Sequence, residues 1–200
     1  CINTMMKAGR EGGFFVTYNH PTWSLEDFED YSKYRGMHAM EIFNTECQNI
    51  GYESYVPGIY DDILRGGERV YAGAADDNHN KFPFGSPECD SFGAFTMILS
   101  KELSYPSVIE ALESGNFYSS MGPIIRALTF DGNKVHIETS DAKQITMLMG
   151  GKATRRALGT KDAPVTSADF EIPLHAPYVR FNILDFEGNR ADTRGIFRDE

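Results

Sequence analysis

The first 120 residues alternate between apolar stretches typical of buried strands and amphipathic stretches typical of helices. Apolar runs that stop at proline or at polar residues predict strands at residues 12–20, 38–44, 69–79 and 92–100. Helices are predicted at residues 24–35, at the end of residues 53–66 and at residues 104–115. This alternation of strand and helix favours a mostly parallel sheet or barrel.

The predicted helix at residues 104–115 carries the clearest end signals. Ser104 can cap its first turn, Pro106 lies within that turn, and Gly115 ends it. The predicted helix at residues 24–35 begins with Ser24, has acidic residues in its first turn and basic residues in its last, and so complements the helix dipole.

The pattern changes after about residue 122, where no convincing helix appears. Asp131-Gly132 and Glu187-Gly188-Asn189 are turn signals between alternating runs, and Gly150-Gly151 separates two apolar runs. We therefore expect two domains: residues 1–122, of the α/β class, and residues 123–200, a small antiparallel β domain of the sandwich type.

Composition and charge narrow the function classes. The 200 residues are 41% hydrophobic and 24% charged, as in a globular protein with room for a sizeable core. The chain has 19 basic and 29 acidic residues, a net charge of −10, and no run of Lys or Arg, which disfavours nucleic acid as a general partner. No apolar run approaches about 20 residues, so we expect no transmembrane helix and no membrane partner.

The three cysteines, Cys1, Cys47 and Cys89, are widely spaced and form no CxxC pair, which disfavours a zinc finger or a disulfide framework. A reducing, cytoplasmic setting is the plainer interpretation. Neither Cys47 nor Cys89 has an evident base partner in the sequence, so a nucleophilic role is not expected.

Candidate chemistry follows two of the predicted strands. His20 comes directly after the first, and Asp77 and His79 form an Asp-x-His pair at the end of the third. Residues two apart in extended backbone point the same way, so the carboxylate and the imidazole can converge on a cation. The alternative interpretation is a hydrogen-bonded loop histidine and an ordinary polar loop.

Three further polar residues lie beside these candidates. Asp76 can act behind the ligands or at a loop turn, and Glu41 and Asn44, at the end of the second strand, can contact substrate or support a ligand. Packing and loop hydrogen bonds are the alternative for both Glu41 and Asn44. The remaining histidines are interpreted as structural or surface residues: His38, His136 and His175.

Several short motifs occur in an order that resembles the carboxy-terminal part of a PHP (polymerase and histidinol phosphatase) domain protein. They are Asn19-His20-Pro21, MEIFN (40–44), RVYAGAADDNH (69–79) and YPSVIEALESGNFYSSMGP (105–123). The trailing YVRFNILDFEGNRADTRGIF (178–197) is similar to the extension found in the CehA/McbA-like branch.

The resemblance implies a distorted (β/α)₇ barrel with two or three divalent metal ions at its strand ends. Carried over by residue, it makes His20, Asp77 and His79 metal ligands, with Mn²⁺, Zn²⁺ or Fe²⁺ as suitable ions. It also implies a hydrolase, a phosphoesterase in the first instance, in which metal-activated water attacks a small-molecule phosphate ester or another ester.

One departure from the family is clear. The family begins with a His-x-His motif, whereas no histidine precedes His20 in this chain. We expect a fragment whose partner is the amino-terminal part of the same polypeptide, or else a degenerate relative. An unfinished barrel also leaves strand edges that favour a partner or homo-oligomer contact. Two alternatives stay open: a non-catalytic binding or interaction module built on a degenerate barrel and the β domain, and an amidohydrolase-like barrel with another metal pattern.

Overall fold

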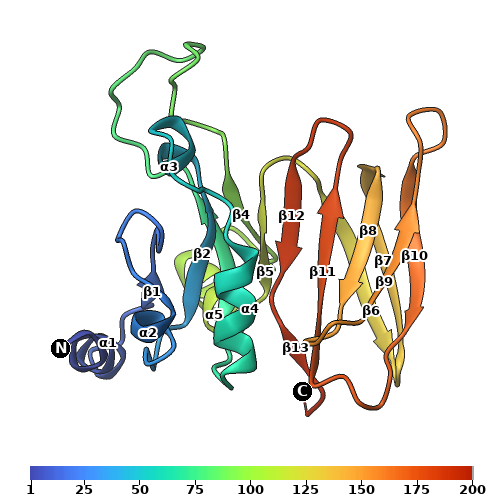
Figure 1. The fold of residues 1–200 in the computed structure, drawn as a ribbon, viewed down its shortest axis with the longest axis horizontal. Helices are drawn as coiled ribbons and strands as arrows, with labels where there is room; N and C mark the ends of the chain where they lie inside the picture. Colours follow the sequence, from blue (N-terminus) through green and yellow to red (C-terminus); the bar gives the residue numbers. More distant parts are fainter. Residues whose placement is uncertain (200) are drawn as a thin grey trace. The chain divides into compact units, whose positions relative to one another are not determined.

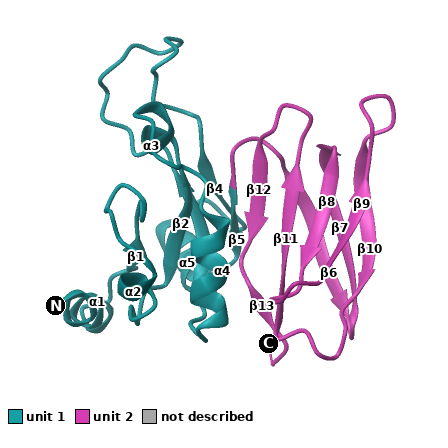
Figure 2. Ribbon diagram, viewed as in Figure 1, with its two compact units in different colours: residues 1–119 teal, residues 120–200 magenta. Residues whose placement is uncertain are grey.

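The computed structural model describes residues 1–199, which form two compact units. The first unit comprises residues 1–119 and the second begins at Ser120 (Figure 2). The sequence placed the boundary between residues 122 and 123. Among the described residues, no helix is both long and apolar enough to cross a membrane.

The first unit contains all the helices of the described chain and five strands (Figure 1). The helices are α1 (Ile2–Glu11), α2 (Phe28–Tyr31), α3 (Thr45–Asn49), α4 (Pro57–Arg65) and α5 (Tyr105–Glu113). The strands are β1 (Thr17–Tyr18), β2 (Ala39–Asn44), β3 (Tyr71–Ala75), β4 (Phe95–Ile98) and β5 (Phe117–Ser120).

Strands β1, β2 and β3 form a parallel sheet in that order. Strand β4 lies beside β3, because the Thr96 hydroxyl both accepts from the Ala74 N–H at 3.1 Å and donates to the Ala74 carbonyl at 2.9 Å. The core of this unit is built where α4 packs on β2, which pairs with β3; its fully buried side chains include Met40, Ile42, Tyr60, Leu64, Val70 and Ala72.

The pairing of β2 with β3 contains a register shift between Glu41 and Phe43. In a regular strand, residues 41 and 44 would point to opposite faces, because side chains alternate. The extra residue resets that alternation. The side chains of Glu41 and Asn44 consequently reach each other, and the Asn44 amide donates to Glu41 Oε2 at 3.0 Å.

The second unit consists of antiparallel strands in two sheets. One sheet has the order β10 (Val165–Glu171), β7 (Lys134–Ala142), β6 (Ile125–Asp131). The other has the order β12 (Arg190–Thr193), β11 (Tyr178–Leu184), β8 (Gln144–Leu148), β9 (Thr154–Leu158), with β13 (Ile196–Phe197) also paired to β11. The rings of Phe170 in β10 and Phe181 in β11 lie 6.2 Å apart, so the inner faces of the two sheets meet.

The expected turns are present in this unit. Gly132 joins β6 to β7 with a φ of 60°, and Gly188 joins β11 to β12 with a φ of 97°. Both values lie in the left-handed region that glycine adopts at little cost, which explains glycine at these hairpin positions.

The structure supports a mixed α/β fold, with most strands of the chain in antiparallel sheets. The described residues show a three-stranded parallel sheet and not a closed (β/α)₇ barrel. The barrel therefore stays an inference from the resemblance.

Some predicted elements are shorter than expected. The helix predicted at residues 24–35 is wrong over most of its length, since only α2 is helical and Asp27, not Ser24, caps it. Leu25 has a φ of 58°, which breaks a helix that would start at Ser24. The strand predicted at residues 12–20 is reduced to β1. By contrast, α5 begins at its predicted cap, where the Ser104 hydroxyl accepts from the Ser107 N–H.

A buried ion pair lies between β11 and β12. Arg180 donates to Asp192 Oδ1 at 2.8 Å, and the two side chains are 2% and 1% exposed. Asn182 donates to the same oxygen at 3.1 Å and accepts from Arg190 at 2.8 Å. Because the charges are removed from water, each depends strongly on its partner.

We predict that Asp192→Ala lowers the free energy of unfolding of the second unit by about 3–5 kcal/mol, because it removes the buried carboxylate that faces the Arg180 guanidinium. Urea denaturation checks the value. The matched control is Asp169→Ala in the same unit, whose 85% exposed carboxylate pairs with His136. Its loss should cost less than about 1 kcal/mol. Equal effects of the two substitutions would contradict the interpretation.

Candidate metal centre

The candidate site lies where the parallel strands of the first unit end. Strands β1, β2 and β3 run in the same direction, so the segments that follow them leave from one edge of the sheet (Figure 1). These segments carry His20 after β1, Asn44 at the end of β2, and Asp76 and Asp77 after β3.

Glu41 is the point at which these strand ends are joined. Its Oε2 accepts from the backbone N–H of His20 at 2.9 Å and from the Asn44 amide at 3.0 Å. The same amide nitrogen lies 3.2 Å from Asp77 Oδ2. One amide thus holds two carboxylates near each other, and His20 is fixed beside them.

The orientation of the Asn44 amide is set by a second bond. Asn44 is the N-cap of α3, and its Oδ1 accepts from the Cys47 N–H at 2.9 Å. Since the carbonyl end faces a donor, the NH₂ end must face the carboxylates. This explains why a buried asparagine ends β2: one side chain begins a helix and bridges two acids.

His20 and Asp77 both adopt left-handed backbone conformations, with φ values of 33° and 54°. Non-glycine residues hold such conformations at a cost of about 1–3 kcal/mol, and they gather at binding and active sites. Two of the three residues that the resemblance makes metal ligands thus adopt this conformation, as do Leu25, Asn80 and Phe92 among the described residues.

Burial changes the ionisation of this cluster. Burial raises the pKa of Glu41, and the bonds from Asn44 and from the His20 N–H offset part of that rise. Burial also raises the pKa of the Cys47 thiol to about 11, with further contributions from Asp77, Glu41 and Glu46. Cys47 is therefore protonated at neutral pH and is a poor nucleophile, in keeping with its sequence context.

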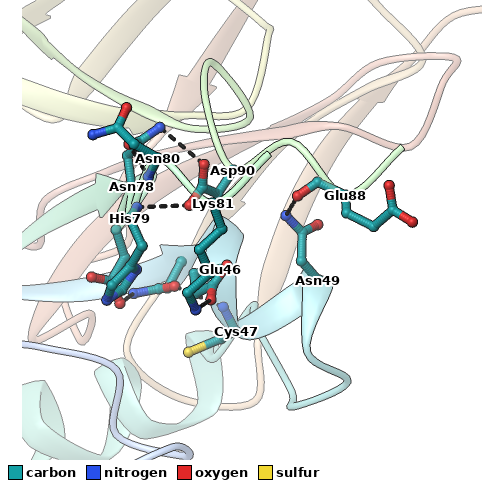
Figure 3. A network of polar contacts seen from close by, with 11 residues as sticks. Glu46, Cys47, Asn49, Asn78, His79, Asn80, Lys81, Glu88 and Asp90 are labelled. Atoms are coloured by element: carbon teal, nitrogen blue, oxygen red, sulfur yellow. Dashed lines mark hydrogen bonds and ion pairs between the residues drawn. The ribbon is translucent and has the colours of Figure 1, made fainter. Parts of the chain in front are cut away.

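A second donor group lies next to the first. One ligand atom each from Glu46, His79 and Asp90 can be chosen so that all three lie within 4.8 Å of one another. Glu46 and Asp90 are buried and His79 is exposed. Figure 3 shows these three residues together with Lys81, whose Nζ lies 2.5 Å from Glu46 Oε1. Such a mixed carboxylate and imidazole group could hold a metal ion.

Asp90 is held by the loop that carries His79. Its Oδ2 accepts from the His79 N–H at 2.7 Å, and its Oδ1 accepts from the Asn78 amide at 3.0 Å (Figure 3). These bonds fix the position of Asp90 relative to the backbone of His79. Each carboxylate oxygen keeps a second lone pair for a cation.

Asp76, which was expected behind the ligands or at a loop turn, closes the base of the loop between β3 and β4. Its carboxylate accepts from the backbone N–H groups of Phe92, Gly93 and Ala94 at 2.5, 2.9 and 2.9 Å. The Thr45 hydroxyl also donates to it, at 3.2 Å. At Gly93 a Cβ would lie 2.5 Å from the Thr45 side chain, so the tight approach requires glycine.

The structure distributes the predicted residues over two groups. His20, Glu41, Asn44 and Asp77 lie in the first group, and His79 lies in the second with Glu46 and Asp90. The sequence did not single out Glu46 or Asp90. Glu46 could have been identified as a candidate ligand from its position just after Asn44, which caps α3. Asp90 lies thirteen residues beyond Asp77, and nothing in the sequence marks it as a candidate.

Two other histidines lie outside these groups. His38 accepts from the Val16 N–H at 2.9 Å and stacks on Phe15 at 4.7 Å, which gives it a structural role. His136 lies in β7, between Asp169 at 2.8 Å and Glu138 at 3.4 Å on an exposed surface.

Comparison with known proteins adds no assignment. No family model matches the chain, and no curated protein matches it.

We predict that Asp76→Asn speeds hydrogen exchange at the amides of Phe92, Gly93 and Ala94. An amide side chain cannot accept at both ends, and a hydrogen bond to a charged group is worth about 1.5–3 kcal/mol, so exchange should quicken by roughly tenfold or more. Exchange mass spectrometry of peptides that cover residues 92–98 measures this. Glu88→Gln is the matched control, because Glu88 is exposed on the same loop and its carboxylate points away from the network in Figure 3. Unchanged exchange in Asp76→Asn would refute the role of the carboxylate.

Proposed function

We propose that this chain is part of a metal-dependent hydrolase that acts on a small-molecule phosphate ester, or on another ester. The observation that carries the proposal is the linkage of three neighbouring parallel strands through Glu41: its carboxylate accepts from the backbone N–H of His20, and the Asn44 amide contacts both Glu41 and Asp77. The carboxyl ends of parallel strands are where catalytic groups gather in α/β proteins.

The side chains present suit divalent metal ions. Atoms that bind one ion at about 2.0–2.2 Å lie within about 4.4 Å of one another, and the Glu46, His79 and Asp90 atoms lie within 4.8 Å. Imidazole and carboxylate donors together suit Mn²⁺, Zn²⁺ or Fe²⁺. We assign His20, Asp77 and His79 to metal binding, as the resemblance implies.

The Ser24 hydroxyl lies 3.2 Å from His20 Nδ1, which leaves Nε2 as the ligand nitrogen that we assign. A partner on one ring nitrogen fixes the orientation of the ring and of the other nitrogen. The Trp23 ring meets the His20 ring edge to face at 5.0 Å and limits its rotation further.

If bound, divalent metal ions would lower the pKa of water and polarise the ester. Around them, this chain would position groups: Glu41 Oε2 accepts from the His20 N–H and from the Asn44 amide, which holds both residues in place at the strand ends.

A cluster of two or three ions needs more ligands than His20, Asp77 and His79. The resemblance implies a His-x-His pair as their source, and the parallel strands β1, β2 and β3 as part of a βα barrel. The three free cysteines accord with the proposed cytoplasmic location.

The test is metal content together with turnover. We predict that the protein retains Mn²⁺, Zn²⁺ or Fe²⁺ after dialysis, and that a panel of phosphate and carboxylate esters reveals hydrolysis that a chelator abolishes. His20→Ala should lower both metal retention and the rate of hydrolysis. The loss should exceed the roughly 10–100-fold that follows when a residue that only hydrogen-bonds to a metal ligand is removed. Elemental analysis and initial rates are the readouts.

The control is His175→Ala, which removes an exposed histidine from the second unit. It should leave metal content and turnover as in the parent protein. If the protein bound no metal and turned over no ester, or if His20→Ala behaved like the parent, the proposed function would be wrong.

A further inference from the structure

Lys81 lies at an unusual place in the second donor group. Its ammonium contacts Glu46 Oε1 at 2.5 Å, and the Glu46 side chain is only 7% exposed. A carboxylate taken out of water needs a counter-charge, and in this conformation Lys81 supplies it. The Lys81 side chain itself is 50% exposed, so it can leave toward solvent without losing a buried position.

The same carboxylate belongs to the group with His79 and Asp90. A divalent ion held by these three residues would share the Glu46 carboxylate with the Lys81 ammonium. Two positive charges on one carboxylate repel each other, and more strongly when they are partly removed from water. Binding of either cation at Glu46 therefore weakens binding of the other.

The backbone around the group favours displacement of Lys81 rather than of His79. The His79 N–H is held by Asp90, and Asn78 is held by Asp90 and Ser91. Lys81, two residues further on, reaches Glu46 through a flexible four-carbon stem (Figure 3). The Asp90 carboxylate and the His79 backbone are thus anchored, whereas the competing cation is on a movable side chain.

We propose that Lys81 is a built-in competitor for a divalent cation at Glu46, His79 and Asp90. In the metal-free state its ammonium neutralises Glu46, and binding of the ion releases Lys81 to solvent. Lys81 then sets a threshold of metal concentration below which this group stays in its ammonium-bound form. The proposal goes beyond hydrolysis, since it concerns binding of the metal alone.

The test is titration of the full chain with Zn²⁺, with calorimetry as the readout of binding. Lys81→Met keeps the apolar stem and removes the charge, and we expect it to bind Zn²⁺ about tenfold more tightly, the gain from removing one charge-assisted competitor. Lys81→Arg keeps a positive charge and should bind within about threefold of the parent. Glu46→Gln removes the shared ligand and should bind more weakly than the parent.

A matched control and a second readout guard against a trivial effect of charge or folding. Lys101→Met removes an exposed lysine that pairs with Glu110, and it should leave Zn²⁺ affinity unchanged. Because Lys81→Met leaves Glu46 without its ammonium, it should melt lower than the parent without metal and gain more in Tm on addition of Zn²⁺.

Equal affinity of the parent and Lys81→Met would overturn the proposal, and so would the lack of any Zn²⁺ binding that depends on Glu46. These outcomes are separable from the proposed function. Zn²⁺ binding that responds to Lys81 and Glu46 without ester turnover supports the competitor and contradicts the hydrolase. Suppose instead that ester turnover needs His20 and that Lys81→Met leaves the Zn²⁺ affinity unchanged. This result supports the hydrolase and contradicts the competitor.

Discussion

Removing carboxylates from water is the constraint on which this structure depends most. Glu41, Asp76, Glu46 and Asp90 are partly or fully buried, and each is matched by a specific donor. Glu41 has the Asn44 amide and the His20 N–H, and Asp76 has three backbone N–H groups. A buried carboxylate without such partners would destabilise the fold by several kcal/mol, so the partners define the loop and strand geometry.

The same constraint connects local structure to chemistry. Asn44 satisfies two acids because a register shift in β2 brings it to the face of Glu41. Its carbonyl end begins α3, which places Glu46 beside the loop that carries His79 and Asp90. Acids concentrated in this way are stabilised further by a cation. A divalent ion and the Lys81 ammonium could each supply that positive charge, and they compete for the Glu46 carboxylate.

Much of the framework could be predicted from the sequence, because local signals determine it. The strand at residues 38–44 and the helix at residues 104–115 have strong apolar patterns and end signals, and both are present as β2 and α5. The placing of His20 and Asp77 at strand ends followed from the same patterns.

What the sequence could not provide depends on tertiary contacts. The register shift in β2 has no local signal, so the contact between Glu41 and Asn44 could not be anticipated. Glu46 and Asp90 are 44 residues apart and meet only because Asp76 and Asp90 fold the loop back on itself. Helix α2 begins after Asp27 because Leu25 has a φ of 58°, and the Ser24 hydroxyl lies 3.2 Å from His20 Nδ1 instead of capping a helix.

The most direct measurement of metal binding at this site is anomalous X-ray diffraction from crystals of the protein grown with Zn²⁺. We expect a peak at the strand ends of the first unit, about 2.0–2.2 Å from a His79 or His20 nitrogen, with Lys81 turned away from Glu46 where that residue binds the ion. No peak in the first unit, or peaks confined to exposed residues such as His136, would contradict it.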